Sequence, residues 1–438
     1  MKIYDVIGIG IGPFNLGLSA LLNDKPINSI FFEKKESFSW HPGLMMDWTT
    51  LQVPFLGDLV TMVDPTNKFS FLNYLQQKNR LYKFYFKENF FITRQEYNDY
   101  CLWVAENCQS CKFGYEVTNI KHTRISGDET WVVTVKNINN KEQQYLTKNI
   151  VLGLGTKPHL PSYLSDTENV HHSSEYLDIK AQALKDQHIT LIGSGQSAGE
   201  IFLDLMKSKN DSTQISWVTR SKGFFPMEYS KLGLEHFSPE YIDYFYNLPQ
   251  TKKPKLLMEQ DLLYKGISAE TISNIYEVLY QETVQNKNNA ELISNSELRN
   301  TDYNNDKLNC FFYHNQQNEE FLIKTDRVIA ATGYKSDITH SLANIEKFIT
   351  KDENGNLLIT RDYKLVTQDT NLNIFVQNAE MHTHGVGTPD LGLGAYRNAV
   401  IANKLLQKEI YKISSKNIFS TFGVPKKYLT QKSSIKAA

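Results

Sequence analysis

Two glycine-rich turns, about 185 residues apart, are the parts of this sequence best suited to chemistry. They read Gly8-Ile9-Gly10-Ile11-Gly12-Pro13-Phe14-Asn15 and Gly193-Ser194-Gly195-Gln196-Ser197-Ala198. Glycines in such a turn let the backbone approach a pyrophosphate, and the helix that follows presents its N-terminus to the negative charge. A single turn of this kind is a weak signal, but two predict two dinucleotide cofactors and electron transfer between them.

The elements around the first turn predict a βαβ unit. Residues 3–9 read as a buried strand, 13–22 as a helix, and 29–33 as a second strand that ends in Glu33. Glu33 lies 23 residues after Gly10, where an acidic side chain accepts hydrogen bonds from a ribose. Gly10 permits the tight turn and Gly12 the close approach to a pyrophosphate, whereas Asn15 replaces the usual third glycine.

The second turn is followed by cations instead of an acid. Residues 189–192 predict a strand, 197–207 a helix, and 215–219 a second strand that leads into Arg220-Ser221-Lys222. Cations at this place suit the 2′-phosphate of NADP, whereas an acid suits NAD. A solvated basic turn is the alternative interpretation of the same residues.

The composition is that of an ordinary globular protein. The chain has 438 residues, 41% of them hydrophobic and 22% charged, with a net charge of −1. That balance gives the whole molecule no attraction to nucleic acid or to an anionic membrane. The sequence has no signal-peptide pattern and no apolar run of about 18 residues, so we expect a cytoplasmic protein.

The cysteines leave a second enzyme class open. Cys108 and Cys111 have the CxxC spacing of redox pairs, and a flavin disulfide reductase has the same two-dinucleotide plan. Such an enzyme needs its pair beside the flavin, but this CxxC lies in neither glycine turn. We therefore interpret the spacing as coincidence and predict no metal site.

Several longer segments carry a family resemblance. The chain resembles the flavin-dependent N-hydroxylating monooxygenases of hydroxamate siderophore biosynthesis, which act on lysine, ornithine or related diamines. Besides the glycine turns, the similar segments are Phe38-Ser-Trp-His-Pro-Gly43, Leu51-Gln-Val-Pro-Phe-Leu56, Asp64-Pro-Thr66, Phe69-Ser-Phe-Leu-Asn-Tyr-Leu75, Ala331-Thr-Gly-Tyr334 and Thr383-His-Gly385. They stand in the family's order and cover nearly the whole chain.

The resemblance implies an α/β fold with two Rossmann-like dinucleotide-binding domains, one for FAD and one for NADPH, and a helical substrate-site insert. We expect the FAD-binding domain at residues 1–180 and again, with a substrate loop, at 331–425. The NADPH-binding domain is expected at 181–330, with the helical insert near 226–285. Residues 426–438 are expected to form a flexible tail, and the enzyme to be a dimer or tetramer.

The resemblance also implies the cofactor-binding residues. FAD would be contacted by Gly10, Gly12, Glu33, Trp40, His41 and Gln52, and NADPH by Gly193, Gly195, Gln196, Ser197 and Arg220. Lys222 adds a second cation for the 2′-phosphate, and Leu391 starts a helix that could face the flavin ring. The other predicted cofactor-binding residues are Pro13, Asn15, Thr332, Gly333, Tyr334 and Gly385. Trp40 and Gln52 would lie beside the isoalloxazine, and Gln52 is our candidate catalytic group. A core aromatic and a turn residue are the structural alternatives for Trp40 and His41. In this family NADPH reduces FAD, O₂ forms a C4a-hydroperoxide, and a neutral primary amine accepts one oxygen.

Four residues suggest which amine is hydroxylated. Gly57 stands where amino-acid hydroxylases of the family carry Lys, Leu234 where ornithine enzymes carry Asn, and Gly392 where both groups tend to have Ser. A buried substrate carboxylate without a cation is costly, so these residues favour a diamine, putrescine or cadaverine. Asp390 would hold its distal ammonium, or else cap a helix that starts at Leu391. Histamine and lysine are the alternative substrates.

Overall fold

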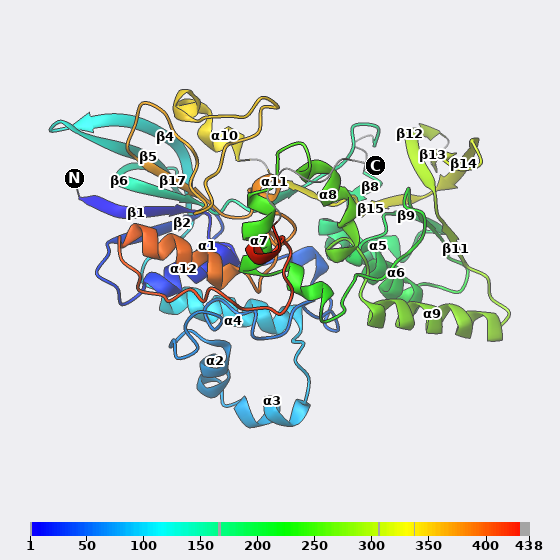
Figure 1. The fold of residues 1–438 in the computed structure, drawn as a ribbon. Helices are drawn as coiled ribbons and strands as arrows, with labels where there is room; N and C mark the ends of the chain where they lie inside the picture. Colours follow the sequence, from blue (N-terminus) through cyan, green and yellow to red (C-terminus); the bar gives the residue numbers. More distant parts are fainter. Residues whose placement is uncertain (1, 165–167, 305–306, 337, 430–438) are drawn as a thin grey trace.

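The first unit of the fold is a mixed sheet. The computed structural model describes residues 2–164, 168–304, 307–336 and 338–429. Among these residues the sheet has the order β3-β2-β1-β6-β5-β4, and a seventh strand, β17, also pairs with β6 (Figure 1). The bounds are β1 Ile3–Ile9, β2 Ser29–Glu33, β3 Cys111–Phe113, β4 Tyr115–Ile125, β5 Asp128–Asn137, β6 Glu142–Leu152 and β17 Asn373–Val376.

Helices cover one face of this sheet because their apolar sides pack on its buried strands. The covering helices are α1 (Pro13–Leu22), α4 (Arg94–Asn107) and α12 (Gly394–Leu405) (Figure 1). Thr93 caps α4 by accepting the backbone N–H of Glu96 at 3.2 Å. The apolar face of α4 is buried and consists of Tyr97, Tyr100, Cys101 and Val104.

The second unit is a parallel sheet with the order β11-β10-β9-β15-β8. Its strands are β8 Val170–His172, β9 His188–Ile192, β10 Gln214–Val218, β11 Ala290–Ile293 and β15 Arg327–Ala330. Helices α5 (Tyr176–Ala183), α6 (Gln196–Ser208) and α9 (Ala269–Val284) accompany it. The predicted α/β fold with two Rossmann-like sheets is confirmed.

The boundary between the two units differs from the expected residue 181. Strand β8 pairs with β15 in the second sheet, so that sheet already includes residues 170–172. Three residues are too short a run for a sequence pattern to reveal. A two-stranded ribbon of β7 (Thr156–Pro158) and β16 (Tyr334–Ser336) forms where the chain passes between the units.

The helical stretch at 226–285 divides into two parts. Helix α9 connects the parallel strands β10 and β11 and packs on α6, so it is the crossover helix of the second sheet. Helices α7 (Pro239–Tyr246) and α8 (Lys253–Glu259) lie instead beside α11 (Met381–His384). Of the helices in the predicted insert, α7 and α8 therefore lie next to the C-terminal segment.

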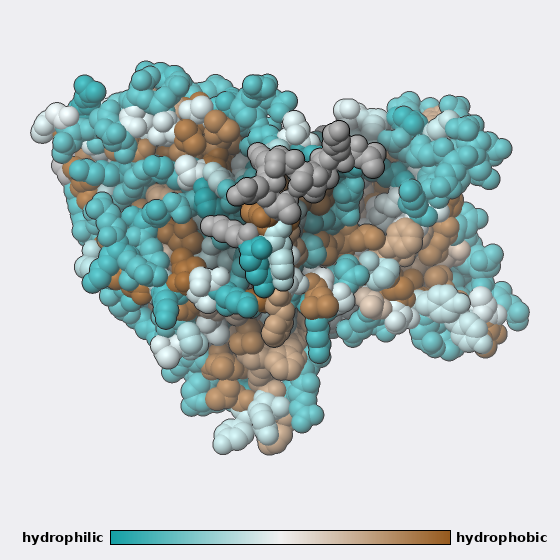
Figure 2. All heavy atoms as spheres, in the orientation of Figure 1, coloured by the Kyte–Doolittle hydropathy of each residue, from teal (hydrophilic) through white to brown (hydrophobic). Residues whose placement is uncertain are grey.

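Shorter elements complete the described chain. Helices α2 (Phe71–Gln77) and α3 (Leu81–Lys87) form a projection on which Figure 2 shows a group of hydrophobic residues. The others are α10 (Thr339–Leu342), the antiparallel strands β12 Ser296–Asn304, β13 Lys307–His314 and β14 Glu319–Thr325, and 3₁₀ turns that include Pro42–Leu44 and Gly233–His236. No described helix has the length and apolarity needed to cross a membrane.

The C-terminal part differs from expectation at its helix. The helix predicted from Leu391 begins at Gly394, because residues 390–393 form a separate turn. Lys426–Tyr428 form a 3₁₀ turn, and residues 430–438 of the predicted flexible tail lie outside the described chain.

Candidate functional site

The first glycine turn forms an open cradle at the N-terminus of α1. Gly10 has φ +84°, and a Cβ there would lie 2.4 Å from the carbonyl oxygen of Gly153, so only glycine fits. A Cβ on Gly12, by contrast, would meet no atom within 4 Å. Glu33 accepts the backbone N–H of Ile11 at 2.9 Å, which brings its carboxylate to the same turn. These residues lie together as the sequence predicts.

Asn15 shapes this turn from behind. Its amide donates to the carbonyl oxygen of Gly10 at 2.8 Å, and its Oδ1 accepts a hydrogen bond from Gln377 at 2.6 Å. The side chain is fully buried, so it supports the turn and does not face the open cradle. Pro13 occupies the first turn of α1, where the missing N–H is not needed.

The second glycine turn has the same design. Gly193 has φ +130°, and a Cβ there would lie 2.5 Å from the carbonyl oxygen of Ala331. Gly195 precedes α6 without a side-chain cap, which leaves the helix N–H groups open. Ser194 and Ser221 hydroxyls lie 2.9 Å apart, so the turn adjoins the segment that carries the exposed Arg220 and Lys222.

The Gln196 side chain is engaged within the protein. Its Nε2 donates to Glu200 at 2.8 Å and to Thr271 at 3.1 Å, and its Oε1 accepts the backbone N–H of Ser268 at 2.7 Å. Gln196 therefore anchors the turn to α9, which leaves its backbone as the group that faces the turn. Ser197 follows it, half-buried, in the first turn of α6.

The predicted residues between the two turns form an aromatic group. The Tyr334 ring lies between the rings of His41 and His172, with centroid distances of 5.7 and 5.0 Å. Trp40 packs against Tyr97 at 5.2 Å and remains half-buried. His41 has φ +49° at the head of the turn Pro42–Leu44.

Thr332 and Gly333 connect this group to the chain that passes between the two units. The Thr332 hydroxyl donates to the carbonyl oxygen of His159 at 2.5 Å. The Gly333 carbonyl oxygen lies 2.9 Å from His172 Nε2. The structure thus brings His41 and Tyr334 together, although they lie far apart in the sequence.

Gln52 presents a polar group that the protein itself does not satisfy. Its Nε2 is buried and has no hydrogen-bond partner among the described residues. Its backbone carbonyl accepts a hydrogen bond from the hydroxyl of Tyr229. Burial and the nearby charge of Asp390 raise the pKa of Tyr229 to about 12. Sequence reasoning missed Tyr229, because its contact with Gln52 spans 177 residues.

Three of the predicted substrate residues meet beside Gln52. A Cβ on Gly57 would lie 3.4 Å from the Cα of Gly392, so the two glycines face each other. Asp390 adjoins them, since a Cβ on Gly392 would lie 2.9 Å from its Oδ1. Burial raises the pKa of Asp390 to about 6. Asp390 thus supplies a carboxylate at this position, and none of the three residues is a cation.

Asp390 also stabilises the backbone at the start of the C-terminal helix, but not as the cap of a helix that begins at Leu391. Its Oδ1 accepts the backbone N–H of Leu393 at 3.0 Å. Leu393 itself is the residue that precedes α12, and α12 has no side-chain cap. The expectation that Asp390 caps a helix starting at Leu391 is therefore wrong, and Asp390 closes the turn that leads into α12.

The remaining predicted residues lie around this group. Gly385 has φ +84°, and its Cβ position lies 3.0 Å from the ring of Phe245 in α7. Leu391 packs at the edge of the core of the first unit. Leu234 lies half-buried in the turn Gly233–His236. Leu234 and Asp390 are not seen in contact in the described chain, so the role of Leu234 in the substrate site stays a prediction.

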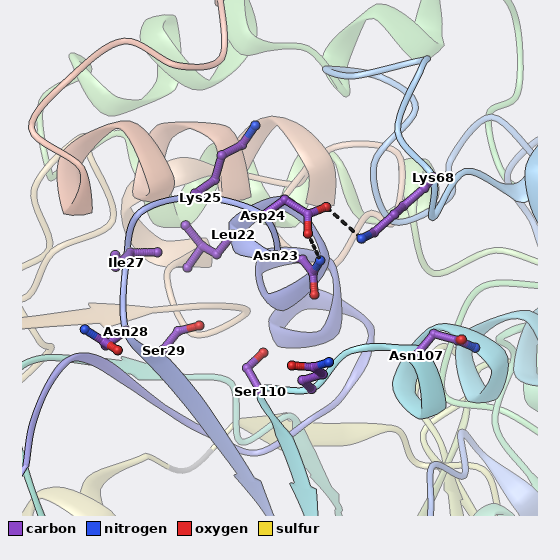
Figure 3. A pocket seen from close by; sticks show the side chains of 11 residues that line it. Leu22, Asn23, Asp24, Lys25, Ile27, Asn28, Ser29, Lys68, Asn107 and Ser110 are labelled. Carbon is purple, nitrogen blue, oxygen red and sulfur yellow. Dashed lines mark hydrogen bonds and ion pairs between the residues drawn. The ribbon is translucent and has the colours of Figure 1, made fainter.

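A polar cavity of about 390 Å³ lies away from these residues. Figure 3 shows it at the C-terminal end of α1, where Asp24 pairs with Lys68 at 2.7 Å. It contains none of the predicted site residues. The thiol of Cys111 contacts Ser19 in the second half of α1 at 3.2 Å. The glycine turn, by contrast, precedes the first residue of α1, so this cysteine is not part of it.

The two turns and the residues between them fit two dinucleotides. Gly12 leaves open space before an uncapped helix, Glu33 lies at the turn, and the buried Nε2 of Gln52 lacks a partner. A mixed sheet and a parallel sheet, each with such a turn at a helix N-terminus, are typical of a two-dinucleotide oxidoreductase.

Comparison with known proteins identifies the family. The family model described as L-lysine 6-monooxygenase/L-ornithine 5-monooxygenase matches residues 2–336. The chain belongs to this family and is a flavin-dependent N-hydroxylating monooxygenase. The disulfide reductase interpretation of the CxxC pair is thereby set aside.

Three relatives cover nearly the whole chain. The rhizobactin siderophore biosynthesis protein RhbE of Rhizobium meliloti is 42% identical, over 97% of this chain and 96% of its own length. A putrescine N-hydroxylase of Shewanella oneidensis is 43% identical, over 96% of this chain and 84% of its own length. The crystal structure of the FAD-bound cadaverine monooxygenase DfoA of Erwinia amylovora is 38% identical, covers 97% of this chain and 99% of DfoA, and has a TM-score of 0.93.

Gly392→Ser tests the proximity of Gly392 to Asp390. The new Cβ would push the Asp390 carboxylate away from its place, so we expect the KM for a diamine to rise by about tenfold. Steady-state kinetics with putrescine and 1-aminobutane measure the effect. The KM for the monoamine should not change, and an equal rise for both amines would contradict a role confined to the distal ammonium.

Proposed function

We propose that this enzyme hydroxylates one nitrogen of a small diamine, putrescine or cadaverine, with FAD and NADPH, for hydroxamate siderophore biosynthesis. The observation that carries the substrate class is the meeting of Gly57, Gly392 and Asp390 at one place. A diamine has no carboxylate, and its second nitrogen is a cation at neutral pH. A site with a carboxylate and two glycines suits that molecule.

The charges at this place argue against an amino-acid substrate. Arg397, whose charge acts on Asp390, is buried and pairs with Glu380 at 3.0 Å, so it is already engaged within the protein. A side chain at position 57 would meet the backbone of Gly392. In this chain the space contains an acid, and a substrate α-carboxylate beside Asp390 would be repelled. The putrescine and cadaverine enzymes among the relatives support the same substrate class.

The protein's own groups would bind and orient the amine and exclude water. FAD, when bound, supplies the activation of O₂, with NADPH as the reductant. Asp390 would hold the distal ammonium, which fixes the other nitrogen in place. Gln52 would donate a hydrogen bond from its unpartnered Nε2 at the cofactor. Tyr229 would close the site, because its hydroxyl bonds to the Gln52 backbone carbonyl and its ring contacts Phe91.

Residues of the two turns would hold the cofactors. Gly10, Gly12 and Glu33 would bind FAD at the first turn, with Trp40, His41 and Leu391 nearby. Gly193, Gly195 and the backbone of Gln196 would bind the NADPH pyrophosphate, and Arg220 with Lys222 its 2′-phosphate. The contact between Ser194 and Ser221 supports this placement, because it brings the cations to the turn.

An amine panel tests the proposal directly. The purified enzyme with FAD and NADPH is assayed for hydroxylated product with putrescine, cadaverine, 1,3-diaminopropane, histamine, ornithine and lysine. We expect a diamine to have the highest kcat/KM. If histamine were the best substrate, the inference that the substrate lacks a carboxylate would stand, and only the identity of the amine would change. Lysine or ornithine as the best substrate would overturn the reasoning from Gly57 and Asp390.

The pH dependence of diamine binding follows from Asp390. With a pKa of about 6, its carboxyl group is ionised above that pH and neutral below it. The ammonium binds the ionised form, so the diamine KM should rise by about tenfold per unit as pH falls through 6. The measurement is the ratio of KM for putrescine to KM for 1-aminobutane, from about pH 8 to about pH 5. Protonation of the reacting nitrogen affects both amines, so its effect cancels in this ratio. A constant ratio would show that Asp390 does not contact the diamine.

A further inference from the structure

A buried ion pair joins the two units at their nucleotide turns. Arg94, the first residue of α4, donates from Nη2 to Oε1 of Glu200 in α6 at 2.7 Å. The Arg94 side chain is 12% exposed and that of Glu200 is 1% exposed. Arg94 belongs to α4 in the helix layer of the first sheet, and Glu200 belongs to α6 of the second unit. The pair is therefore a polar contact between the two nucleotide units.

Each partner is tied to a predicted cofactor segment. On the first unit, Arg94 Nη1 donates to the carbonyl oxygen of Leu44 at 3.2 Å, in the turn that follows His41. On the second unit, Glu200 Oε1 accepts Nε2 of Gln196 at 2.8 Å, at the glycine turn itself. A chain of hydrogen bonds thus runs from the His41 segment through Arg94 and Glu200 to the second turn.

This arrangement is expensive for folding stability. Glu200 Oε2 is buried without a hydrogen-bond partner in the described chain, so a single oxygen takes both bonds. Burial raises the pKa of Glu200, and the Arg94 charge opposes that rise. Apolar side chains of similar size would fill such a place at no loss of stability. A buried pair is therefore better explained by the geometry that it imposes than by the stability that it adds.

We propose that Arg94 and Glu200 are positioning residues that fix the NADPH-binding turn relative to the flavin segment. This inference rests on the proposed NADPH site at residues 193–197. Transfer of a hydride from NADPH to the flavin, which converts them to NADP⁺ and reduced flavin, needs the two rings in contact. A misplacement of about 1 Å lowers such a rate by about a hundredfold. The ion pair sets that distance without touching either cofactor.

The test uses a double variant that keeps the interior free of unpaired charge. Arg94→Met alone leaves Glu200 buried without its partner and endangers folding, whereas Arg94→Met with Glu200→Met removes both charges. The matched control is Lys209→Met with Glu282→Met. That pair is also buried, with side chains 3% and 15% exposed at 2.9 Å, but both residues belong to the second unit.

Four measurements separate positioning from folding. They are thermal unfolding, the equilibrium Kd for NADP⁺, amide hydrogen exchange without NADPH, and anaerobic flavin reduction by NADPH in a stopped-flow instrument. For the Arg94/Glu200 double variant we expect a wild-type Tm and a Kd within about threefold. Exchange of the peptides at 42–46 and 192–200 should be faster, and flavin reduction slower by at least about tenfold. Reduction by dithionite should keep its wild-type rate.

The control variant should match the wild type in peptide exchange at 42–46 and in flavin reduction. Wild-type exchange and reduction in the Arg94/Glu200 variant would overturn the positioning role. So would an equal loss in the Lys209/Glu282 control, because the effect would then follow from any lost buried pair. If NADPH did not reduce the flavin of the wild-type enzyme, the proposed NADPH site itself would be wrong. This inference would then fail with it.

Discussion

Asp390→Asn is expected to raise the KM for putrescine or cadaverine by at least about 30-fold. In the proposed complex, the variant removes the charge that faces the distal ammonium and leaves that cation without a counter-charge. Loss of one partner from a buried charge pair costs about 2–5 kcal/mol, which corresponds to this factor or more. Steady-state kinetics that follow the hydroxylated product, not NADPH consumption, measure the effect.

The design of this variant separates binding from the structural role of Asp390. The Asn side chain still carries an oxygen that can accept the N–H of Leu393, so the turn before α12 is kept. 1-Aminobutane serves as the control substrate, because it lacks the second ammonium. An unchanged KM for the diamine would show that Asp390 only closes the turn, and the substrate proposal would lose its main support.

Gly12→Val should abolish FAD binding while the protein without cofactor keeps its stability. The space before Gly12 is empty of protein atoms, and its φ of −81° suits any residue, so a larger side chain costs little in the fold. A valine there would occupy the proposed place of the pyrophosphate and weaken FAD binding by at least about a hundredfold. Isothermal titration with FAD and thermal unfolding without FAD measure the two effects.

Gly10→Ala provides the contrast for that experiment. Its Cβ would lie 2.4 Å from the carbonyl oxygen of Gly153, at a positive φ of +84°. We expect this variant to lose about 2–5 kcal/mol of unfolding free energy. Its main defect should therefore be in folding stability, and any loss of FAD binding should follow from that. FAD binding by Gly12→Val at wild-type strength would contradict the placement of FAD at the first turn.

Local patterns predicted the βαβ start of each sheet. The runs 3–9, 13–22 and 29–33 match β1, α1 and β2 residue for residue, because buried apolar runs and a glycine turn leave few alternatives. The helix predicted from Leu391 begins only at Gly394, because Asp390 accepts the backbone N–H of Leu393 and holds residues 391–393 in a turn.

Contacts between distant segments could not be predicted. The Tyr229–Gln52 hydrogen bond and the Arg94–Glu200 ion pair join segments 177 and 106 residues apart, and no local pattern records them. The structure also gives Asn15 and Gln196 supporting roles, because both side chains are satisfied inside the protein. Gly57 and Gly392 could be named only through the family resemblance, and their mutual contact becomes visible only in the fold. Self-association stays a prediction.

The discontinuous first sheet has a consequence for biosynthesis. Its strands β1 to β6 end at Leu152, but β17 begins only at Asn373. The nucleotide unit, from β8 to β15, is complete at Ala330 and can fold on the ribosome while the flavin unit still lacks a strand. Helix α12, which holds α1 through the bond from Asn398 to Phe14, emerges later still. The cell therefore completes the second unit before the first, and in the proposed function FAD binding waits for the last part of translation.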